Sequence, residues 1–392
     1  MLGVHAFHAS GKRSSALEDR AATRNKHPAK MPLPQFVAFL AGLLLILTAL
    51  LSAVKTFVLP RSAPDPIARM VFRTLRRLFE LAMHRLRTYR ARDAVMAFYA
   101  PLALLALLPT WLAMIITGYA AMYWALGDGT WYQSFVISGS SLLTLGFAGA
   151  EGWVNLLLIL SEATLGLIMV AILIAYLPTI YAAFARREAA VSMLEVRAGS
   201  PPSAVEMILR YHRLHGLDSL GEAWATWEVW FTELEESHTS LAALVFFRSP
   251  KPEHSWVTAA GAVLDSAALM NALVDTPPNF RADLTIRAGY LALRSIADYF
   301  GVAYPAQPKP DDPISLSRAE FEAAVARLRA QGVPLKADLD QAWRDFAGWR
   351  VNYDHALIAL THITMAPPAP WSSDRGSPDP AATAIAPFRN GR

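Results

Sequence analysis

Residues 131–152 read WYQSFVISGSSLLTLGFAGAEG and lie between two long apolar runs. The stretch is too short and too rich in Ser and Gly to cross a bilayer, whereas the runs on either side are long enough. Its first part, Trp131 to Leu143, has the length of a short helix, and Thr144 to Ala148 is small, extended and interrupted by glycine. Non-helical backbone at membrane depth is tolerated only where protein buries it or where it lines a water-filled path. We therefore expect a re-entrant pore loop.

The sequence LTLGFA at 143–148 resembles the TTVGYG selectivity filter of potassium channels, and an aromatic and hydroxyl-rich segment precedes it, as in that family. In such filters, backbone carbonyls and a Thr hydroxyl replace the hydration shell of the ion. The resemblance implies that the filter consists of Thr144, Leu145, Gly146, Phe147 and Ala148.

Ala148 stands where the family has its second glycine, and Gly149 follows one residue later. A filter needs residues with positive φ so that successive carbonyls point inward, and an alanine in that conformation costs about 1–2 kcal/mol. Two other interpretations stay open. The stretch could be an ordinary extracellular connection, or the chain could be a non-conducting membrane receptor or scaffold with a channel-like fold.

The composition separates a membrane half from a soluble half. Of 392 residues, 54% are hydrophobic, and these concentrate before residue 185. The net charge of +4 and the clustering of Arg at 61–92 favour a membrane surface over nucleic acid as a partner. The absence of Cys excludes disulfides, thiol catalysis and Cys-ligated metal sites.

We predict an all-α membrane protein with three transmembrane helices, a re-entrant pore helix and filter loop, and an all-helical cytoplasmic domain. The predicted segments are a disordered N-terminal tail 1–33, transmembrane helix 34–59, basic amphipathic cytoplasmic linker 61–93, pore domain 94–187, helical cytoplasmic domain 188–365 and disordered tail 366–392. Within the pore domain we expect an outer helix 94–126, the pore loop 131–152 and an inner helix 154–184. Translation could start at Met1 or at Met31.

The linker carries Arg61 to Arg92 at helical spacing with apolar residues, which is typical of a helix lying on anionic headgroups. Such a helix either transmits motion to the pore or only determines the membrane topology of the chain. Its positive charge places this segment, and the domain after Arg186 and Arg187, in the cytoplasm.

Three residues of the inner helix are candidates for a role in conduction or gating. Glu162 must face protein or water. It could form a ring of four carboxylates that concentrates cations, or brace the filter through hydroxyls such as Ser138, Ser140 and Ser141. Gly166 is a candidate hinge, and Pro178 should kink the helix at a cytoplasmic gate.

The soluble half has few candidate catalytic or metal-binding residues. The run of Trp224, Trp227, Trp230, Phe231, Leu234 and His238 is typical of a buried helix face. Glu236 and His238 with His254, or His355 with His362, could be combined into a metal or acid/base site, but no established motif supports this. We expect no enzyme and no cofactor or metal beyond permeant ions, and we leave open a ligand of residues 200–365.

Together these features predict the pore-forming subunit of a homotetrameric cation channel. One loop per chain requires four copies to close a filter, and the resemblance implies potassium as the permeant ion. The expected location is a bacterial inner membrane, crossed several times, with the C-terminal domain in the cytoplasm.

Overall fold

The computed structural model describes residues 32–59 and 65–376. In these ranges the regular structure is helical, and the β contact within them is a single bridge between Val274 and Leu335. The all-α prediction is therefore confirmed for the described chain. The predicted start at Met31, the N-terminal tail to residue 31 and the last residues of the C-terminal tail lie outside the described residues.

Four helical stretches in the described ranges are long and apolar enough to cross a membrane, which indicates a membrane protein. They are α2 (Leu33–Phe57), α4 with α5 (Tyr89–Leu126), α7 (Trp153–Ala198) and α10 (Trp256–Leu273). The most apolar windows of the first three are 28%, 33% and 22% buried, whereas that of α10 is 94% buried. Helix α10 therefore has protein around nearly its whole surface.

The described chain divides into two compact units. The first contains residues up to Leu47 and Met114–Leu165, and the second contains Thr48–Ala113 and Gly166–Arg392. Helices α2, α5 (Tyr99–Leu126) and α7 each contribute one part to each unit. Helix α6 (Trp131–Leu142) belongs wholly to the first unit.

In the first unit, α2 and α5 approach so closely that glycine is required on both. A Cβ on Gly42 would lie 2.3 Å from the carbonyl oxygen of Gly118, and a Cβ on Gly118 would lie 2.7 Å from Gly42 O. Contacts between small residues of this kind let apolar helices pack backbone to backbone without a hydrophobic driving force. They fix α2 against α5.

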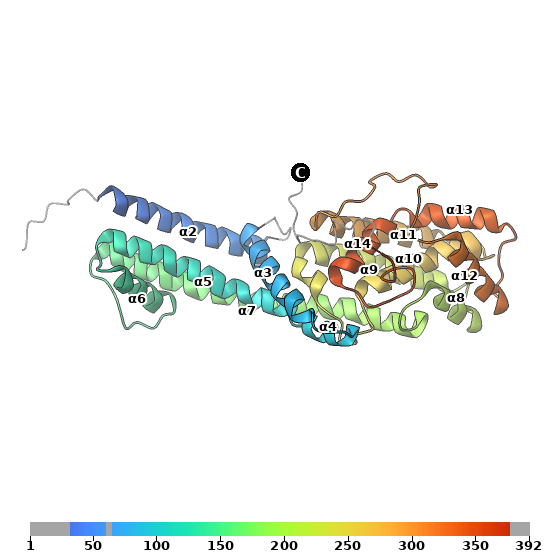
Figure 1. Cartoon of the computed structure of the whole chain (residues 1–392), viewed down its shortest axis with the longest axis horizontal. Coiled ribbons are helices and arrows are strands. Elements are labelled where there is room, and N and C mark those ends of the chain that lie inside the picture. Colours follow the sequence, from blue (N-terminus) through green and yellow to red (C-terminus); the bar gives the residue numbers. More distant parts are fainter. Residues whose placement is uncertain (1–31, 60–64, 377–392) are drawn as a thin grey trace, which may run out of the picture. The chain divides into compact units, whose positions relative to one another are not determined.

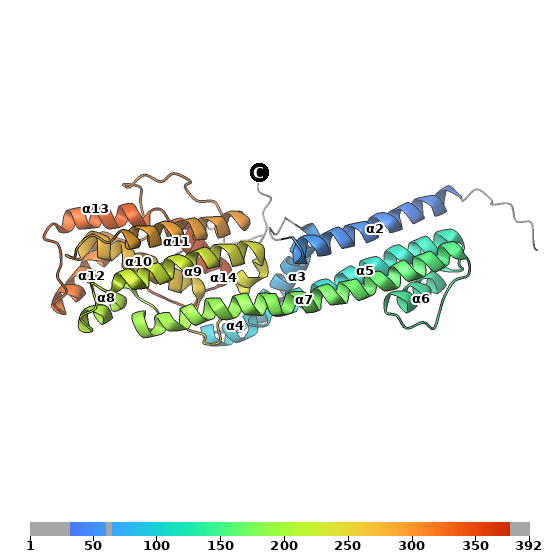
Figure 2. The same ribbon diagram turned by 180° about the vertical axis from the view of Figure 1, so that it is seen from behind.

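The second unit contains a bundle of the helices that follow α7, shown from both sides in Figures 1 and 2. Its members besides α10 are α8 (Ala204–Arg213), α9 (Leu220–Ser240), the 3₁₀ helix η1 (Ala242–Phe246), α11 (Phe280–Tyr299), α12 (Arg318–Ala330), α13 (Leu339–Arg350) and α14 (Asp354–Thr364). Helix α10 packs against α8, α11, α13 and α14, and α9 packs against α11. The predicted aromatic face of α9 is confirmed as core, since Trp224, Trp227 and Phe231 are all at most 1% exposed.

The centre of this bundle holds an ionic cluster around Arg350. This side chain is fully buried and pairs with Asp265 at 2.5 Å and with Asp354 at 2.8 Å. The hydroxyl of Tyr353 also donates to Asp265, at 2.8 Å. Because every partner is paired, the cluster avoids the penalty of an uncompensated buried charge and fixes α10, α13 and α14 together.

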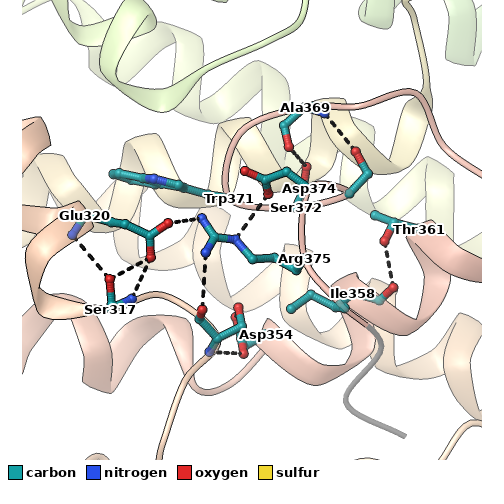
Figure 3. A network of polar contacts seen from close by, with 12 residues as sticks. Ser317, Glu320, Asp354, Ile358, Thr361, Ala369, Trp371, Ser372, Asp374 and Arg375 are labelled. Carbon is teal, nitrogen blue, oxygen red and sulfur yellow. Dashed lines mark hydrogen bonds and ion pairs between the residues drawn. The ribbon is translucent and has the colours of Figure 1, made fainter. Parts of the chain in front are cut away.

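The C-terminal segment corrects the prediction of a disordered tail from residue 366. The structure describes residues up to 376, and Figure 3 shows Arg375 of this segment beside Glu320 of the bundle. Arg375 lies 2.6 Å from Glu320, and Trp371 O accepts from the buried Arg350 at 2.5 Å. The Arg375 guanidinium holds the pKa of Glu320 down at about 2, so this ion pair persists at physiological pH.

The predicted linker helix is also corrected, because it consists of two helices. Helix α3 (Pro66–Met83) starts at an Asp65 cap, and α4 (Tyr89–Met96) starts at a Thr88 cap whose hydroxyl accepts from Ala91 N. The cap at Thr88 ends the continuous pattern that the sequence suggested. The outer helix likewise begins at Tyr99, because a turn at residues 97–98 separates it from α4.

Candidate pore loop and its supports

Helix α6 begins and ends sharply, which sets the position of the loop after it. Thr130 forms a capping box with Gln133, in which the side chain of each residue bonds the backbone of the other. The helix then stops after Leu142, too short to cross a hydrocarbon layer. Ser138, Ser140 and Ser141 are all buried near its end.

The loop after α6 alternates in backbone conformation. Thr144 has φ 56° and Gly146 has φ 70°, both in the left-handed region. A β-branched residue in this region is an outlier that the surrounding structure must hold in place. The backbone N–H groups of Thr144 and Leu145 do so by donating to the carbonyls of Ser141 at 3.0 Å and Ser140 at 2.8 Å.

Ser140 ties the far end of the filter segment back to the helix. Its hydroxyl accepts from the backbone N–H of Ala148 at 3.0 Å. The side chains of Leu145 and Phe147 are 60% and 69% exposed, so they do not pack inside the single chain. The segment Thr144 to Ala148 is thus tied at both ends to the last turn of α6, through Ser140 and Ser141.

The strain expected at Ala148 is absent. In this stretch the non-glycine residue with positive φ is Thr144. A Cβ at Gly146 would meet nothing within 4 Å, so its glycine is required by backbone conformation and not by space. The missing second glycine therefore carries no conformational cost in this conformation.

Glu162 lies behind the loop, fully buried. One carboxyl oxygen accepts from the Ser138 hydroxyl and the other from Tyr123 at 3.1 Å. Ser138 also lies 3.0 Å from the carbonyl of Ile116 on α5. Of the two roles expected for Glu162, this geometry fits the brace, because both carboxyl oxygens are engaged within one chain.

Of the three serines, the Glu162 carboxylate bonds Ser138. Ser141 donates instead to Ile137 O in its own helix at 2.9 Å. Ser161, the residue before Glu162 on α7, makes a 2.8 Å hydrogen bond with Tyr119. The sequence suits Tyr119 and Tyr123 to interfacial or pore-packing positions, and their four-residue spacing places them on one face of α5. Their hydrogen bonds to Ser161 and Glu162 are the part that the sequence does not predict.

The far end of the loop is fastened separately. The side-chain amide of Asn155 donates to Asp128 at 2.8 Å and to Glu151 O at 2.8 Å. Asp128 precedes α6 and Asn155 lies in the first turn of α7, so this contact closes the loop at its base.

No family model, no curated protein and no solved structure matches this chain. The interpretation of the loop therefore depends on its own geometry and on the resemblance of six residues.

The candidate gating residues lie in an unbroken helix. Helix α7 continues through Gly166 and Pro178 to Ala198 without interruption. Pro178 cannot donate a backbone hydrogen bond, which makes this turn weaker than its neighbours. Tyr176, two residues before it, packs on Phe57 with ring centroids 4.4 Å apart.

Arg187 is the main feature that sequence reasoning missed. It was taken only as a mark of the cytoplasmic side, but it is 3% exposed. Its guanidinium donates to Leu244 O and Phe247 O, each at 2.8 Å, and pairs with Glu188. These bonds fix α7 to the segment after α9.

His238 completes this junction and is not paired with His254. Its Nε2 lies 3.3 Å from Arg187 and its Nδ1 lies 2.9 Å from Leu234 O. Burial and the Arg187 charge lower the pKa of His238 well below its usual range. His254, which the sequence allowed as its partner, lies instead 3.2 Å from Glu195.

A second junction joins α4 to the bundle. Arg248 pairs with the buried Asp93 at 3.1 Å and donates to Met365 O at 2.8 Å. The Tyr99 ring contacts Phe246 at 5.5 Å between centroids. The helices on both sides of the pore loop, α5 with its α4 extension and α7, are therefore each fastened to the helical bundle.

Proposed function

We propose that this chain is the pore-forming subunit of a homotetrameric cation channel with potassium as the permeant ion. The observation that carries the proposal is the α6 loop: a short non-spanning helix followed by a turn with positive φ at Thr144 and Gly146. Alternation between left-handed and ordinary conformations aims successive carbonyls in a common direction, which is what ion coordination requires.

Burial supports a three-span arrangement. We assign α2, α5 with α4, and α7 to the membrane, because their apolar surfaces are largely uncovered in the single chain. We assign α10 to the bundle core, because its surface is covered by other helices and it surrounds the buried ion pairs of Asp265. In this arrangement the end of α5 and the start of α7 lie on the same side of the membrane. The loop between them is then re-entrant.

Four copies are needed because each chain supplies one loop. The exposed Leu145 and Phe147 side chains have no partner within the chain and would pack in the assembly. Glu162, engaged with Ser138 and Tyr123, would hold each α6 at a fixed distance from the axis. A filter coordinates selectively only if its supports keep the carbonyls in place.

The helical bundle would set the probability of opening. Arg187 fastens α7 to the bundle, so a change in the bundle can pull on the helix past Pro178. Exposed arginines on α3, on α4 and in the turn between them would contact anionic headgroups on the cytoplasmic face of a bacterial inner membrane; they are Arg77, Arg85, Arg87, Arg90 and Arg92.

The test is ion flux from proteoliposomes under potassium and sodium gradients. Gly146→Ala introduces a side chain at φ 70° and should abolish selective flux. Gly149→Ala is the matched control, since Gly149 has no positive φ and its Cβ would lie 3.9 Å from Ile159, an ordinary contact. An assembled tetramer without flux would favour the scaffold interpretation.

A further inference from the structure

The junction between α7 and the segment after α9 fixes the protonation state of one histidine. His238 is fully buried, with Nδ1 2.9 Å from Leu234 O and Nε2 3.3 Å from Arg187 Nη1. A carbonyl oxygen only accepts hydrogen bonds and a guanidinium only donates them. Nδ1 must therefore carry the proton, and Nε2 must be the acceptor. The ring is neutral because both of its partners require it to be.

Arg187 uses this acceptor while it holds two backbone carbonyls. Its Nη1 also donates to Leu244 O at 2.8 Å, and its Nη2 donates to Phe247 O at 2.8 Å. Leu244 lies in η1 and Phe247 follows directly after it. The guanidinium is 3% exposed and pairs with the Glu188 carboxylate at 2.8 Å. One buried side chain of α7 is thus fastened to both α9 and η1.

A second proton on His238 would turn the contact with Arg187 into a repulsion. Nε2–H would point at a group that has no acceptor, and two positive charges would be buried with their nitrogen atoms 3.3 Å apart. Like charges at this distance repel strongly where water is excluded. The closed junction and a charged His238 therefore exclude each other.

The neighbours of the His238 ring supply no free carboxylate. Helix α9 provides Leu234 O and the Ser237 hydroxyl, which lies 3.1 Å from Nδ1. Helix α10 provides the Trp256 ring, 4.8 Å away between centroids. On α7 the buried Glu188 is already the counter-charge of Arg187. The other charged groups near this part of α7 and α9 are exposed to solvent; they are Arg186, Glu233 and Glu236.

We propose that this junction is a proton-operated latch: uptake of a proton by His238 releases Arg187 from Leu244 O and Phe247 O and frees α7 from η1. Burial and the Arg187 charge keep the pKa of His238 low while the latch is closed, whereas a solvated histidine has a pKa near 6.5. Only the released state takes up the proton between these values. The ratio of released to closed latch should therefore rise about tenfold for each pH unit below about 6.5.

The latch itself does not depend on the proposed channel function, but its consequence rests on it. Helix α7 runs without interruption from the end of the candidate pore loop to beyond Arg187. If the chain is a channel, release in acid would change its open probability.

The test is the distance between two spin labels in the full chain in detergent, measured by pulsed electron paramagnetic resonance between pH 5 and 8. The chain has no cysteine, so labels attach only to Ala189→Cys on α7 and Thr226→Cys on α9, two exposed positions. We expect one narrow distance at pH 8 and a second, broader population in acid. The ratio of the two should change about tenfold per pH unit below about 6.5.

His238→Gln keeps one donor and one acceptor but takes up no proton, so the acid population should disappear. His254→Gln is the matched control and should keep it. His254 is the other histidine near this end of α7, and its protonation would strengthen its contact with Glu195, 3.2 Å away, instead of opening the latch.

A distance that does not change with pH, an acid population that persists in His238→Gln, or one that is lost in His254→Gln would overturn the proposal. If His238→Gln does not fold, the unmodified histidine decides, because a slope other than one proton per released latch would also overturn it. Release in acid from a chain that conducts no ions would leave the latch in place and count against the channel.

Discussion

Replacing Glu162 separates the two roles that a buried carboxylate behind the loop can have. Glu162→Ala removes the acceptor of the Tyr123 hydroxyl, whereas Ser138 keeps the Ile116 carbonyl as a partner. One orphaned hydroxyl costs about 1–3 kcal/mol, and the space left by the removed atoms adds a cavity penalty. We expect a total loss of about 3–5 kcal/mol. Glu162→Gln keeps the volume and one carbonyl acceptor, and should cost about 1 kcal/mol.

The assay is thermal unfolding of the purified chain in detergent, followed by circular dichroism. Glu151→Ala is the matched control, because Glu151 is an exposed carboxylate in the same loop whose side chain has no partner there. Glu162→Ala should unfold several degrees below it. If both variants unfold at the same temperature, the brace is refuted. A Glu162→Gln variant that unfolds normally but loses cation flux at low salt would instead support a ring of carboxylates.

Three further predictions concern the fold. Gly42→Ala should lower the unfolding temperature, because its Cβ would lie 2.3 Å from a backbone oxygen. Gly139→Ala is the control and should not lower it, because its Cβ would meet nothing within 4 Å. Thermal unfolding in detergent compares the two variants. The buried His238 has a folded pKa below its unfolded value near 6.5, so stability should fall as the pH drops below about 6.5, where only the unfolded state takes up the proton. Denaturant titration between pH 5 and 8 measures this slope, and a His238→Gln variant that keeps the full slope would contradict it. Arg350→Met leaves two buried carboxylates without a counter-charge and should cost about 3–5 kcal/mol in chemical unfolding, and a loss below 1 kcal/mol would show that the cluster is dispensable.

The helices could be predicted from sequence because their signals are local. Apolar length identifies α2, α5 and α7, and the Thr130 cap followed by Gln133 identifies the start of α6. The aromatic face of α9 follows from spacing alone. Capping at Thr88 is equally local, yet the strong periodicity on both sides masked it.

The supports of the loop could not be predicted, because they are contacts between distant residues. Glu162 was recognised as a residue that needs partners, but whether it would face Ser138 or the axis depends on the rotation of α7. From sequence, Arg187 was interpreted only as a positive charge after a transmembrane helix, since two consecutive arginines there usually mark the cytoplasmic side. Its burial depends on carbonyls about sixty residues later in the chain.

The central claim is that the loop conducts cations, and the reversal potential in a planar bilayer tests it most directly. Under a tenfold gradient of potassium chloride, a cation-selective pore should reverse at about 59 mV with the sign set by potassium. Gly146→Ala should abolish that current, and Gly149→Ala should keep it. A reversal potential of the opposite sign, or a Gly146→Ala variant that conducts as the unmodified chain does, would contradict the account.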